Sequence, residues 1–156
     1  MVIVLDNVRS IHNVASIFRT ANGAGIEKIY ACGFTPSPLD RFGTVLRDFA
    51  KVALGAERAV SWEKMETAAA AVQKLKKAGY MIIAAELSPE AIPYHTLKLK
   101  RADLAKTAVI FGHETEGISP ALLKKADKVI SIPMNGAKES LNVSVAAGIV
   151  LYGLQY

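Results

Sequence analysis

Short runs of apolar residues alternate along the chain with longer segments whose apolar and polar positions follow a helical period. The first run, Met1 to Leu5, is rich in β-branched residues and is typical of a buried parallel strand. Asn13 precedes apolar residues at helical spacing, and the glycines of segment 23–25 can adopt the left-handed conformation that ends a helix. We therefore predict a strand over 1–5, followed by a helix with Asn13 as its N-cap.

The same alternation continues to the end of the chain. Further strands are predicted over residues 28–31, 80–85, 108–111 and 128–132. Further helices, of which the last is apolar almost all round, are predicted over residues 62–78, 119–125 and 142–156. Pro36 and Pro38 interrupt segment 33–58, which we predict to be a long loop with one or two helical turns.

Strands that alternate with helices throughout predict one α/β domain over residues 1–156. Its sheet should be mostly parallel, with five or six strands and helices on both faces. Ligands of open parallel sheets bind at the carboxyl ends of the strands. The loops of functional interest are therefore those after Leu5, Ala85, Phe111 and Ile132.

Composition excludes several classes of protein. Hydrophobic residues make up 51% of the chain and charged residues 21%, which argues against disorder. The single cysteine, Cys32, excludes an intrachain disulfide, and no Cys or His residues have zinc-ligand spacing, so we expect a reducing cytoplasm and no metal. The longest apolar stretch, 143–154, is far shorter than the roughly 20 residues of a membrane span, and no export signal is visible, so no membrane partner is expected.

The charge balance permits a nucleic-acid partner without requiring one. Nineteen Lys and Arg against fourteen Asp and Glu give a formal net charge of +5. A basic chain is the first property expected of an RNA- or DNA-binding domain, but many basic domains use their charge only for solubility. The glycine-rich signatures of dinucleotide-binding folds and P-loops are absent.

Residues at the predicted strand ends have a structural explanation beside a functional one. Arg19 lies on the side of the first helix that faces away from the apolar stripe, as solvated arginines do. The loop 112–117 is either a turn that needs flexible residues or a place where glycine lets a ligand approach the backbone. Cys32 follows a strand in apolar company and is predicted to be a buried packing residue.

Three segments, taken together, favour the functional explanation. They are HNVASIFRTANGAG (12–25), VIFGHETEGIS (109–119) and ISIPMNGAKESLNVSVAAG (130–148), and each lies at the end of a predicted strand. In this order they resemble the three motifs of the SpoU (TrmH-like) family of RNA 2'-O-ribose methyltransferases, within the SPOUT superfamily. The resemblance extends over essentially the whole chain and implies a single SPOUT methyltransferase domain.

The resemblance implies a set of catalytic residues. In the family, the arginine that matches Arg19 faces the ribose 2'-hydroxyl and a nearby phosphate, and the asparagine that matches Asn13 positions the reacting groups. Glu114 matches the glutamate that shapes the second-motif loop, and Ser140 and Asn142 match positions that line the same site.

The resemblance also implies a cofactor, S-adenosyl-L-methionine, whose adenosine is held by backbone groups. The residues that we predict to bind it are Leu87, Gly112, Gly117, Ile132, Met134 and Leu141. Family members bind the cofactor in a C-terminal trefoil knot and form homodimers that share the active site. We expect both features here on the resemblance alone, because general topology rules argue against knots.

Methyl transfer from a sulfonium requires the accepting hydroxyl to be held in line, which positioning alone can largely supply. The ribose hydroxyl is a poor acid, and the family account often makes the arginine its base. A guanidinium whose pKa exceeds about 12 can instead bind phosphate and stabilise an alkoxide. Both roles stay open for Arg19.

The sequence departs from the family pattern in two respects, one in the second motif and one in how RNA is selected. His113 stands where many relatives carry asparagine or another polar residue. We also expect this protein to select RNA without the terminal segments that many relatives use for that purpose. Substrate contacts would then come from the stretch Arg41–Arg58 and from Lys98, Lys100 and Arg101, which are equally consistent with a solvated surface.

The sequence therefore predicts a cytoplasmic, homodimeric enzyme that methylates a ribose 2'-hydroxyl in structured RNA, with tRNA slightly favoured over rRNA. One alternative is a non-catalytic RNA-binding or assembly module that retains the cofactor fold. A second alternative is a basic α/β protein that binds a small nucleotide metabolite, which would explain the sheet but not the third motif.

Overall fold

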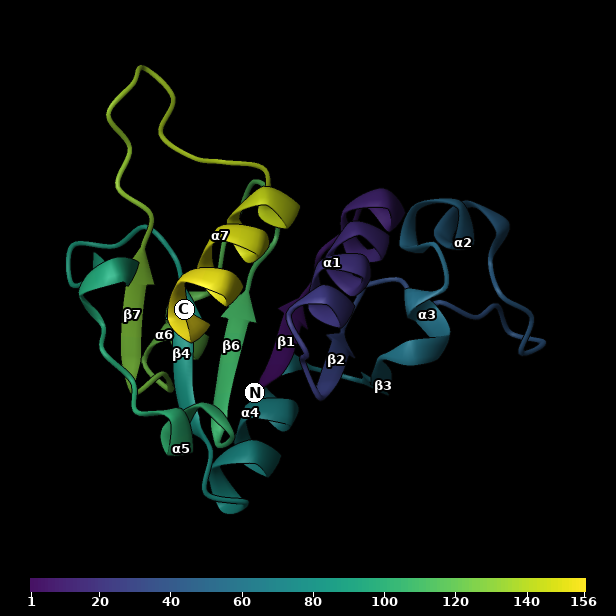
Figure 1. The fold of residues 1–156 in the computed structure, drawn as a ribbon, viewed down its shortest axis with the longest axis horizontal. Coiled ribbons are helices and arrows are strands. Elements are labelled where there is room, and N and C mark those ends of the chain that lie inside the picture. Colours follow the sequence, from purple (N-terminus) through teal and green to yellow (C-terminus); the bar gives the residue numbers. More distant parts are fainter.

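A computed structural model describes residues 1–156, and all seven strands form one parallel sheet. The strands are β1 (Val2–Asp6), β2 (Lys28–Cys32), β3 (Ser61–Met65), β4 (Met81–Ala85), β5 (Ile92–Pro93), β6 (Thr107–Phe111) and β7 (Lys128–Ser131). Their order across the sheet is β3-β2-β1-β6-β4-β7-β5 (Figure 1). The central strands β1 and β6 are neighbours in parallel register, with Val2 opposite Ala108, so the first and second motifs leave the sheet side by side.

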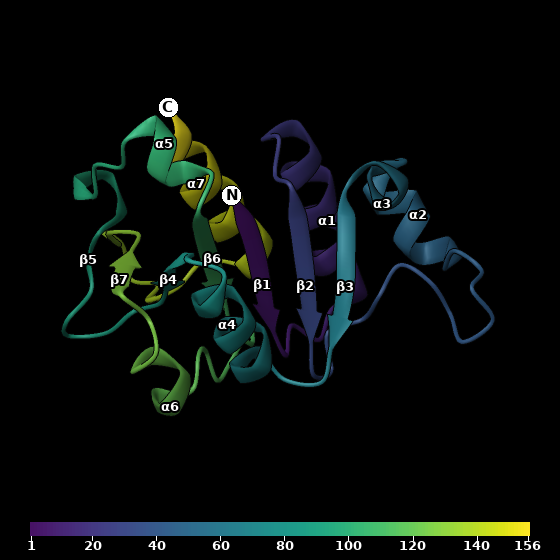
Figure 2. The same ribbon diagram turned by 90° about the horizontal axis from the view of Figure 1, so that it is seen from below.

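Helices cover both faces of the sheet, as the sequence predicts (Figure 2). One face carries α1 (Ile11–Gly23), α2 (Arg47–Ala53), α3 (Ala56–Ala59), the short α5 (Arg101–Leu104) and α7 (Val143–Gln155), with the 3₁₀ turn η1 (Tyr94–Thr96) beside α7. The other face carries α4 (Ala68–Lys77) and α6 (Pro120–Leu123). Each layer has its own apolar core, because alternate side chains of each strand point to opposite faces.

The prediction of one helix over 62–78 was wrong. Residues 61–65 form the edge strand β3, which pairs with β2, and the helix begins only after Thr67, whose hydroxyl accepts a hydrogen bond from the amide of Ala70. Glu63 on this strand forms ion pairs of 2.7 Å with both Lys28 and Lys74. Pairing with a neighbouring strand thus overrode the helical composition of the segment. With β3 and the two-residue β5, the sheet has seven strands rather than five or six.

The prediction of Asn13 as an N-cap was also wrong. The cap of α1 is Ser10, whose side-chain oxygen accepts a hydrogen bond from the amide of Asn13 at 3.3 Å. Asn13 therefore lies in the first helical turn, where its side chain is free to reach other segments. Ser119 and Asn142 are the N-caps of α6 and α7, since their side chains accept hydrogen bonds from the amides of Leu122 and Ser144.

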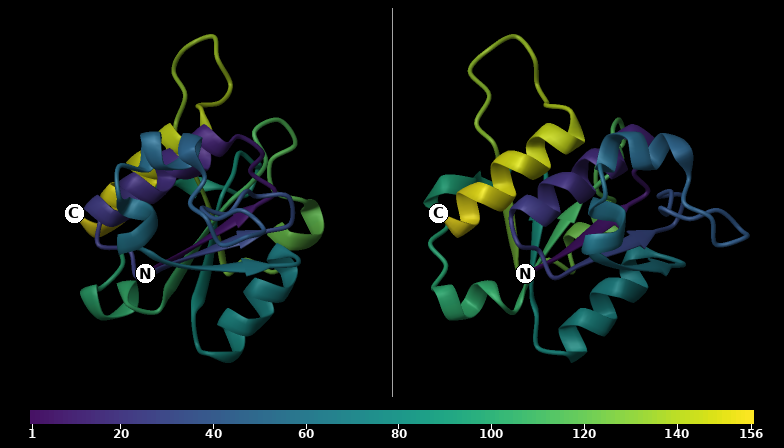
Figure 3. Two further views of the ribbon diagram at one scale, coloured as in Figure 1. Left: turned by 90° about the vertical axis from the view of Figure 1, so that its right-hand side faces the viewer. Right: turned by 45° about the vertical axis from the view of Figure 1, so that its right-hand side comes forward.

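Helix α7 lies against α1 on one side and η1 on the other (Figure 3). Its inward face is buried at Val143, Ala147, Val150, Leu151 and Leu154. Its outward face is less polar than a surface helix usually is, with Val145 and Tyr152 nearly half exposed. No helix of this structure combines the length and apolar character that a membrane crossing requires.

Cys32 is fully buried at the end of β2, as predicted. Burial, reinforced by the nearby carboxylate of Asp6, raises the pKa of its thiol to about 12. A thiol with such a pKa stays protonated at neutral pH, and Cys32 is therefore a packing residue rather than a nucleophile.

Candidate active site

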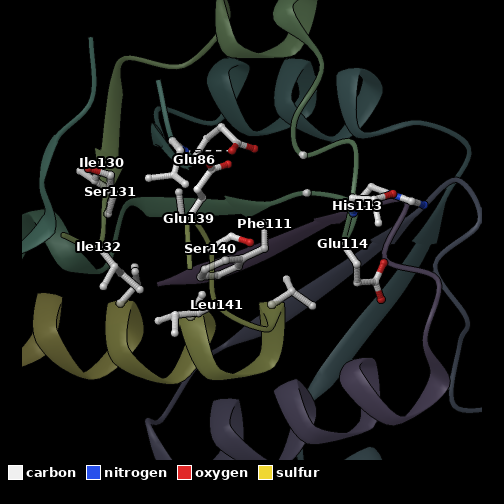
Figure 4. A pocket seen from close by; sticks show the side chains of 18 of the residues that line it. Glu86, Phe111, His113, Glu114, Ile130, Ser131, Ile132, Glu139, Ser140 and Leu141 are labelled. Atoms are coloured by element: carbon white, nitrogen blue, oxygen red, sulfur yellow. Dashed lines mark hydrogen bonds between the residues drawn. The ribbon is translucent and has the colours of Figure 1, made fainter. Parts of the chain in front are cut away.

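A cavity of about 300 Å³ opens at the carboxyl ends of β4, β6 and β7 and is bounded by the start of α7 (Figure 4). This is the edge of a parallel sheet at which ligands of this fold class bind. Its lining residues are drawn from four segments that are distant in sequence and fall within 85–87, 111–117, 130–134 and 139–150. Half of the lining residues are hydrophobic, which suits a flat, partly apolar ligand.

The predicted cofactor residues all meet at this cavity. Its lining includes Leu87, Gly112, Gly117, Ile132, Met134 and Leu141. Two of the predicted catalytic residues, Glu114 and Ser140, line it as well. The remaining three, Asn13, Arg19 and Asn142, lie outside its wall.

The second-motif loop is a tight turn built on β6. His113 and Gly117 pair in antiparallel fashion through two backbone hydrogen bonds of 3.2 and 3.0 Å. The Nδ1 atom of His113 accepts from the amides of Thr115 and Glu116, both at 3.2 Å. Position 113 therefore needs a side chain that accepts hydrogen bonds, and the ring nitrogen of histidine is such an acceptor.

The two glycines of this loop are required by close backbone approach. A Cβ atom on Gly112 would lie 2.5 Å from the carbonyl carbon of Gly117 and 2.6 Å from the amide nitrogen of Ile118. Gly117 has a φ of +66° and would drive a Cβ into the carboxylate of Glu86. Only glycine allows the loop to close this tightly at the cavity.

Glu86 is a functional candidate that the sequence analysis missed. It follows β4 directly and lines the cavity, where its Oε2 atom accepts from the amide of Ile118 at 2.7 Å and Oε1 accepts from the amide of Leu87 at 2.9 Å. It thereby joins the end of β4 to the second-motif loop. The available signal was an acidic residue immediately after an apolar strand, at the edge where ligands bind.

Glu114 connects the second-motif loop to the start of α1. Its Oε1 atom accepts from the amide of Ser10 and from the side-chain Nδ2 of Asn13, and its Oε2 accepts from the amide of Arg9, each at 3.0 Å. Burial acts to raise the pKa of this carboxyl, but these hydrogen bonds outweigh it and lower the pKa to about 2. The carboxylate also lies at the positive end of the α1 dipole, which favours its charged form.

A second set of hydrogen bonds continues from Asn13 to the third motif. The Nδ2 atom of Asn142 donates to Oδ1 of Asn13 at 3.1 Å. Oδ1 of Asn142 in turn accepts from the amide and hydroxyl of Ser144, at 2.8 and 2.7 Å. Glu114, Asn13 and Asn142 therefore link all three motifs beside the cavity, and the two asparagines act as connectors whose amides are oriented at both ends.

Arg19 occupies a different environment. Its side chain is exposed, and it forms no ion pair or hydrogen bond within the chain. The structure therefore leaves this guanidinium free on the surface of α1, and does not bring it to the cavity of the same chain. Lys98, Lys100 and Arg101 are likewise exposed, on the segment that leads into α5.

We expect Glu114→Gln to destabilise the protein in a pH-dependent way. The folded-state pKa of Glu114 is lowered from 4.5 to about 2, so its stabilising contribution is complete above pH 4.5 and is lost as the pH falls toward 2. At pH 7 the variant should lose about 1 kcal/mol of unfolding free energy, a modest value because the site is exposed and solvent-screened.

Urea unfolding of both proteins between pH 7 and pH 3 measures this difference. The gap between wild type and variant should narrow below pH 4.5. Glu116→Gln is the matched control, because the Glu116 carboxylate in the same loop accepts no hydrogen bond. A gap that stayed constant down to pH 3 would contradict the role assigned to the Glu114 carboxylate.

The seven-stranded parallel sheet, with a cavity at the carboxyl ends of its strands, defines an α/β protein of the class whose ligands bind at that edge. A sequence model of the family described as "SpoU rRNA Methylase family" matches residues 1–152. The chain belongs to this family.

Two curated relatives and one solved structure illustrate the similarity. The chain is 32% identical over 156 residues to a tRNA (guanosine(18)-2'-O)-methyltransferase of Aquifex aeolicus, covering 99% of this chain and 68% of that protein. It is 32% identical over 152 residues to the 23S rRNA (guanosine-2'-O-)-methyltransferase RlmB of Neisseria meningitidis, covering 97% and 56% respectively. The crystal structure of an AdoMet-bound rRNA methyltransferase from Sinorhizobium meliloti superposes with a TM-score of 0.85 at 27% identity, covering 99% of this chain and 55% of that one. The chain thus spans between about half and two thirds of these proteins.

Proposed function

We propose that the protein transfers a methyl group from S-adenosyl-L-methionine to a ribose 2'-hydroxyl in structured RNA. The observation that carries the proposal is the hydrogen-bonded link from Glu114 through Asn13 to Asn142, which holds the three family motifs together beside one cavity. A protein that had lost its activity would have no need to keep this connected set of polar side chains.

The cavity fits the cofactor in size and in chemistry. Its volume of about 300 Å³ lies within the range of small-molecule sites. The side chains of Leu87, Ile132 and Leu141 offer apolar surface for an adenine ring, and the backbone of the second-motif loop lies at the cavity, where it can meet the polar atoms of the ring. When bound, the cofactor supplies an electrophilic methyl group on a sulfonium.

The polar residues beside the cavity position the RNA and stabilise charge. Glu114 holds the start of α1, so that Asn13 presents a fixed amide toward Asn142. Ser140 lines the cavity at its rim and can hydrogen-bond the ribose. Arg19 offers a guanidinium that can bind a phosphate and stabilise negative charge that develops on the 2'-oxygen.

A homodimer explains why Arg19 lies outside the cavity of its own chain. The α1–α7 surface exposes apolar side chains, with Val145 at 49% and Tyr152 at 44%, and the C-terminal Tyr156 is stacked on Tyr152. A second copy of the chain would cover this surface. The proposed active site is then shared, and an Arg19 side chain approaches the cavity across the interface.

The proposal also includes a knotted chain, the class of RNA substrate and the cellular location. The contacts of α7 with both α1 and η1 support a C-terminal trefoil knot, in which the end of the chain passes through the segment between β4 and β6. We propose tRNA as the substrate ahead of rRNA, and the cytoplasm as the location. The tRNA substrate is supported by the Aquifex aeolicus relative, whose name states that it methylates guanosine 18 of tRNA.

The test is methylation of unmodified RNA with radiolabelled S-adenosyl-L-methionine, followed by separation of RNA sizes and alkaline digestion. A methylated 2'-oxygen cannot attack the adjacent phosphodiester, so the label should survive in dinucleotides from the tRNA fraction. Label in mononucleotides would mean base methylation. Cofactor binding without any labelled RNA would favour the non-catalytic module if the protein still binds RNA. If the protein does not bind RNA and RNA does not change cofactor binding, the result would favour the metabolite-binding alternative.

A further inference from the structure

The loop between β2 and α2 contains an ordered hairpin that projects from the molecule (Figures 1 and 3). Leu39 and Val45 form an antiparallel bridge, and the amide of Leu46 donates to the carbonyl of Pro38 at 2.9 Å. The hairpin lies at the opposite end of the sheet from β7 and the cavity. It is therefore a structured feature that the proposed reaction centre does not use.

The tip of the hairpin is held in one conformation by Asp40. Its Oδ1 atom accepts from the amides of Phe42 and Thr44, at 2.8 and 2.9 Å. The amide of Asp40 donates to the carbonyl of Thr44 at 2.9 Å, and Gly43 takes the left-handed conformation that the turn requires, with a φ of +79°. The backbone beneath residues 41 and 42 is thus fixed before any partner binds.

This rigid tip presents an aromatic ring to solvent. The chain has five phenylalanines, of which Phe18, Phe49 and Phe111 are buried in the core. The other two belong to the β2–α2 loop, where Phe42 is 76% exposed and Phe34 is 84% exposed. The fold therefore buries phenylalanine wherever it serves packing, and exposes it only on this loop.

Neighbouring groups support both exposed phenylalanines, and each ring remains open to a flat partner. The guanidinium carbon of Arg41 lies 4.7 Å from the centroid of the Phe42 ring, which covers one face and leaves the other open. Phe34 follows β2, and its amide donates to Oδ1 of Asn7 at 3.0 Å, so its backbone is also anchored. Arg47, exposed and without an ion pair, stands at the start of α2 directly after the hairpin.

We propose that Phe42, with Arg41 behind it, is a platform on which an unpaired base of the RNA substrate stacks, and that Phe34, on the same loop, offers a second ring for another base. Bases offer the π-faces that aromatic side chains accept, and Arg41 and Arg47 supply the positive charge for adjacent phosphates. The inference rests on the proposed function, because it assumes an RNA substrate. The platform binds the RNA at a distance from the reacting nucleotide. It therefore contributes to the affinity for RNA rather than to the rate of methyl transfer.

The first test compares Phe42 variants in binding to an unmodified tRNA transcript, measured by fluorescence anisotropy. Phe42→Ala should weaken binding about tenfold, the loss typical of one base–aromatic stack. Phe42→Trp should bind as tightly as wild type, whereas Phe42→Leu, which keeps apolar bulk without a π-face, should resemble the alanine variant. Cofactor affinity and thermal stability should be unchanged in all three, because the side chain is mostly exposed to solvent and does not line the cavity.

Salt dependence separates stacking from charge. Phe42→Ala should weaken binding equally at every salt concentration, whereas Arg47→Ala should reduce the slope of log affinity against log salt by about 0.7 to 0.9, the value for one lost phosphate contact. The indole fluorescence of Phe42→Trp, corrected for Trp62 with wild-type protein, should be quenched on addition of the transcript.

Each contrary result has a separate meaning. If Phe42→Ala and Phe34→Ala bind the transcript as wild type does, the platform is wrong while the proposed function stands. If Phe42→Ala instead changes the sedimentation of the protein, the hairpin is a contact between copies of the chain and the platform is overturned. If wild type neither binds nor methylates RNA, the proposed function and the platform fail together.

Discussion

Arg19→Ala is expected to lower the rate of methyl transfer about 10²–10³-fold, the loss that follows removal of one group stabilising a developing oxyanion. The rate is measured by single-turnover transfer of labelled methyl to an unmodified tRNA transcript. Because Arg19 forms no ion pair or hydrogen bond in the folded chain, the variant should unfold at the same urea concentration as wild type.

Arg19→Lys distinguishes charge from guanidinium geometry. Lysine keeps the positive charge but cannot bind a phosphate in the bidentate manner of arginine, so its rate should fall at least tenfold at every pH tested. Lys77→Ala, which removes an exposed cation from α4 on the other face of the sheet, serves as the charge control. Near-normal turnover of Arg19→Lys over a wide pH range would show that guanidinium-specific chemistry is wrong.

Gly112→Ala is expected to weaken binding of S-adenosyl-L-methionine by about 100-fold or more. Its Cβ would lie 2.5 to 2.6 Å from backbone atoms of Gly117 and Ile118, and neither strand of the turn can move without opening the cavity wall. Local strain of this kind costs about 1–3 kcal/mol, and the displaced wall adds the loss of cofactor contacts. Isothermal titration calorimetry gives the affinity directly.

Gly148→Ala is the matched control for this substitution. Gly148 lies within α7 outside the cavity wall, and a Cβ there would meet only the methyl group of Thr20, at an ordinary 3.8 Å. The control should bind the cofactor as wild type does, because alanine also favours the helical conformation. Wild-type affinity in Gly112→Ala would contradict the assignment of this loop as the cofactor wall.

The position of the cavity could be predicted from the sequence because it depends on local properties. The apolar runs predicted to end at Ala85, Phe111 and Ile132 define three strand ends, and parallel strands bring such ends to one edge. The glycines at 112 and 117 indicated a backbone that approaches something closely, and the structure shows that this is the loop itself. All six residues expected to contact a cofactor accordingly lie around one cavity.

The connections within the site could not be predicted in the same way. Glu114 bonds to Ser10 and Asn13 across more than 100 positions of sequence, because β6 inserts beside β1 in the sheet. The misassigned N-cap has the same origin, since Ser10 takes that role and releases Asn13 for Glu114 and Asn142. Glu86 was missed because its partners belong to a loop that only strand order brings near it.

The sequence by itself determined the α/β alternation, the burial of Cys32 and the loops that form the cavity. These depend on period, propensity and turn chemistry, which act over a few residues. The tertiary structure decided the seven-strand order, the edge strand at 61–65, the position of Arg19 outside the cavity and the hydrogen bonds that join the three motifs. Those features depend on which strand lies beside which, and contacts between distant segments leave no periodic signal in the chain.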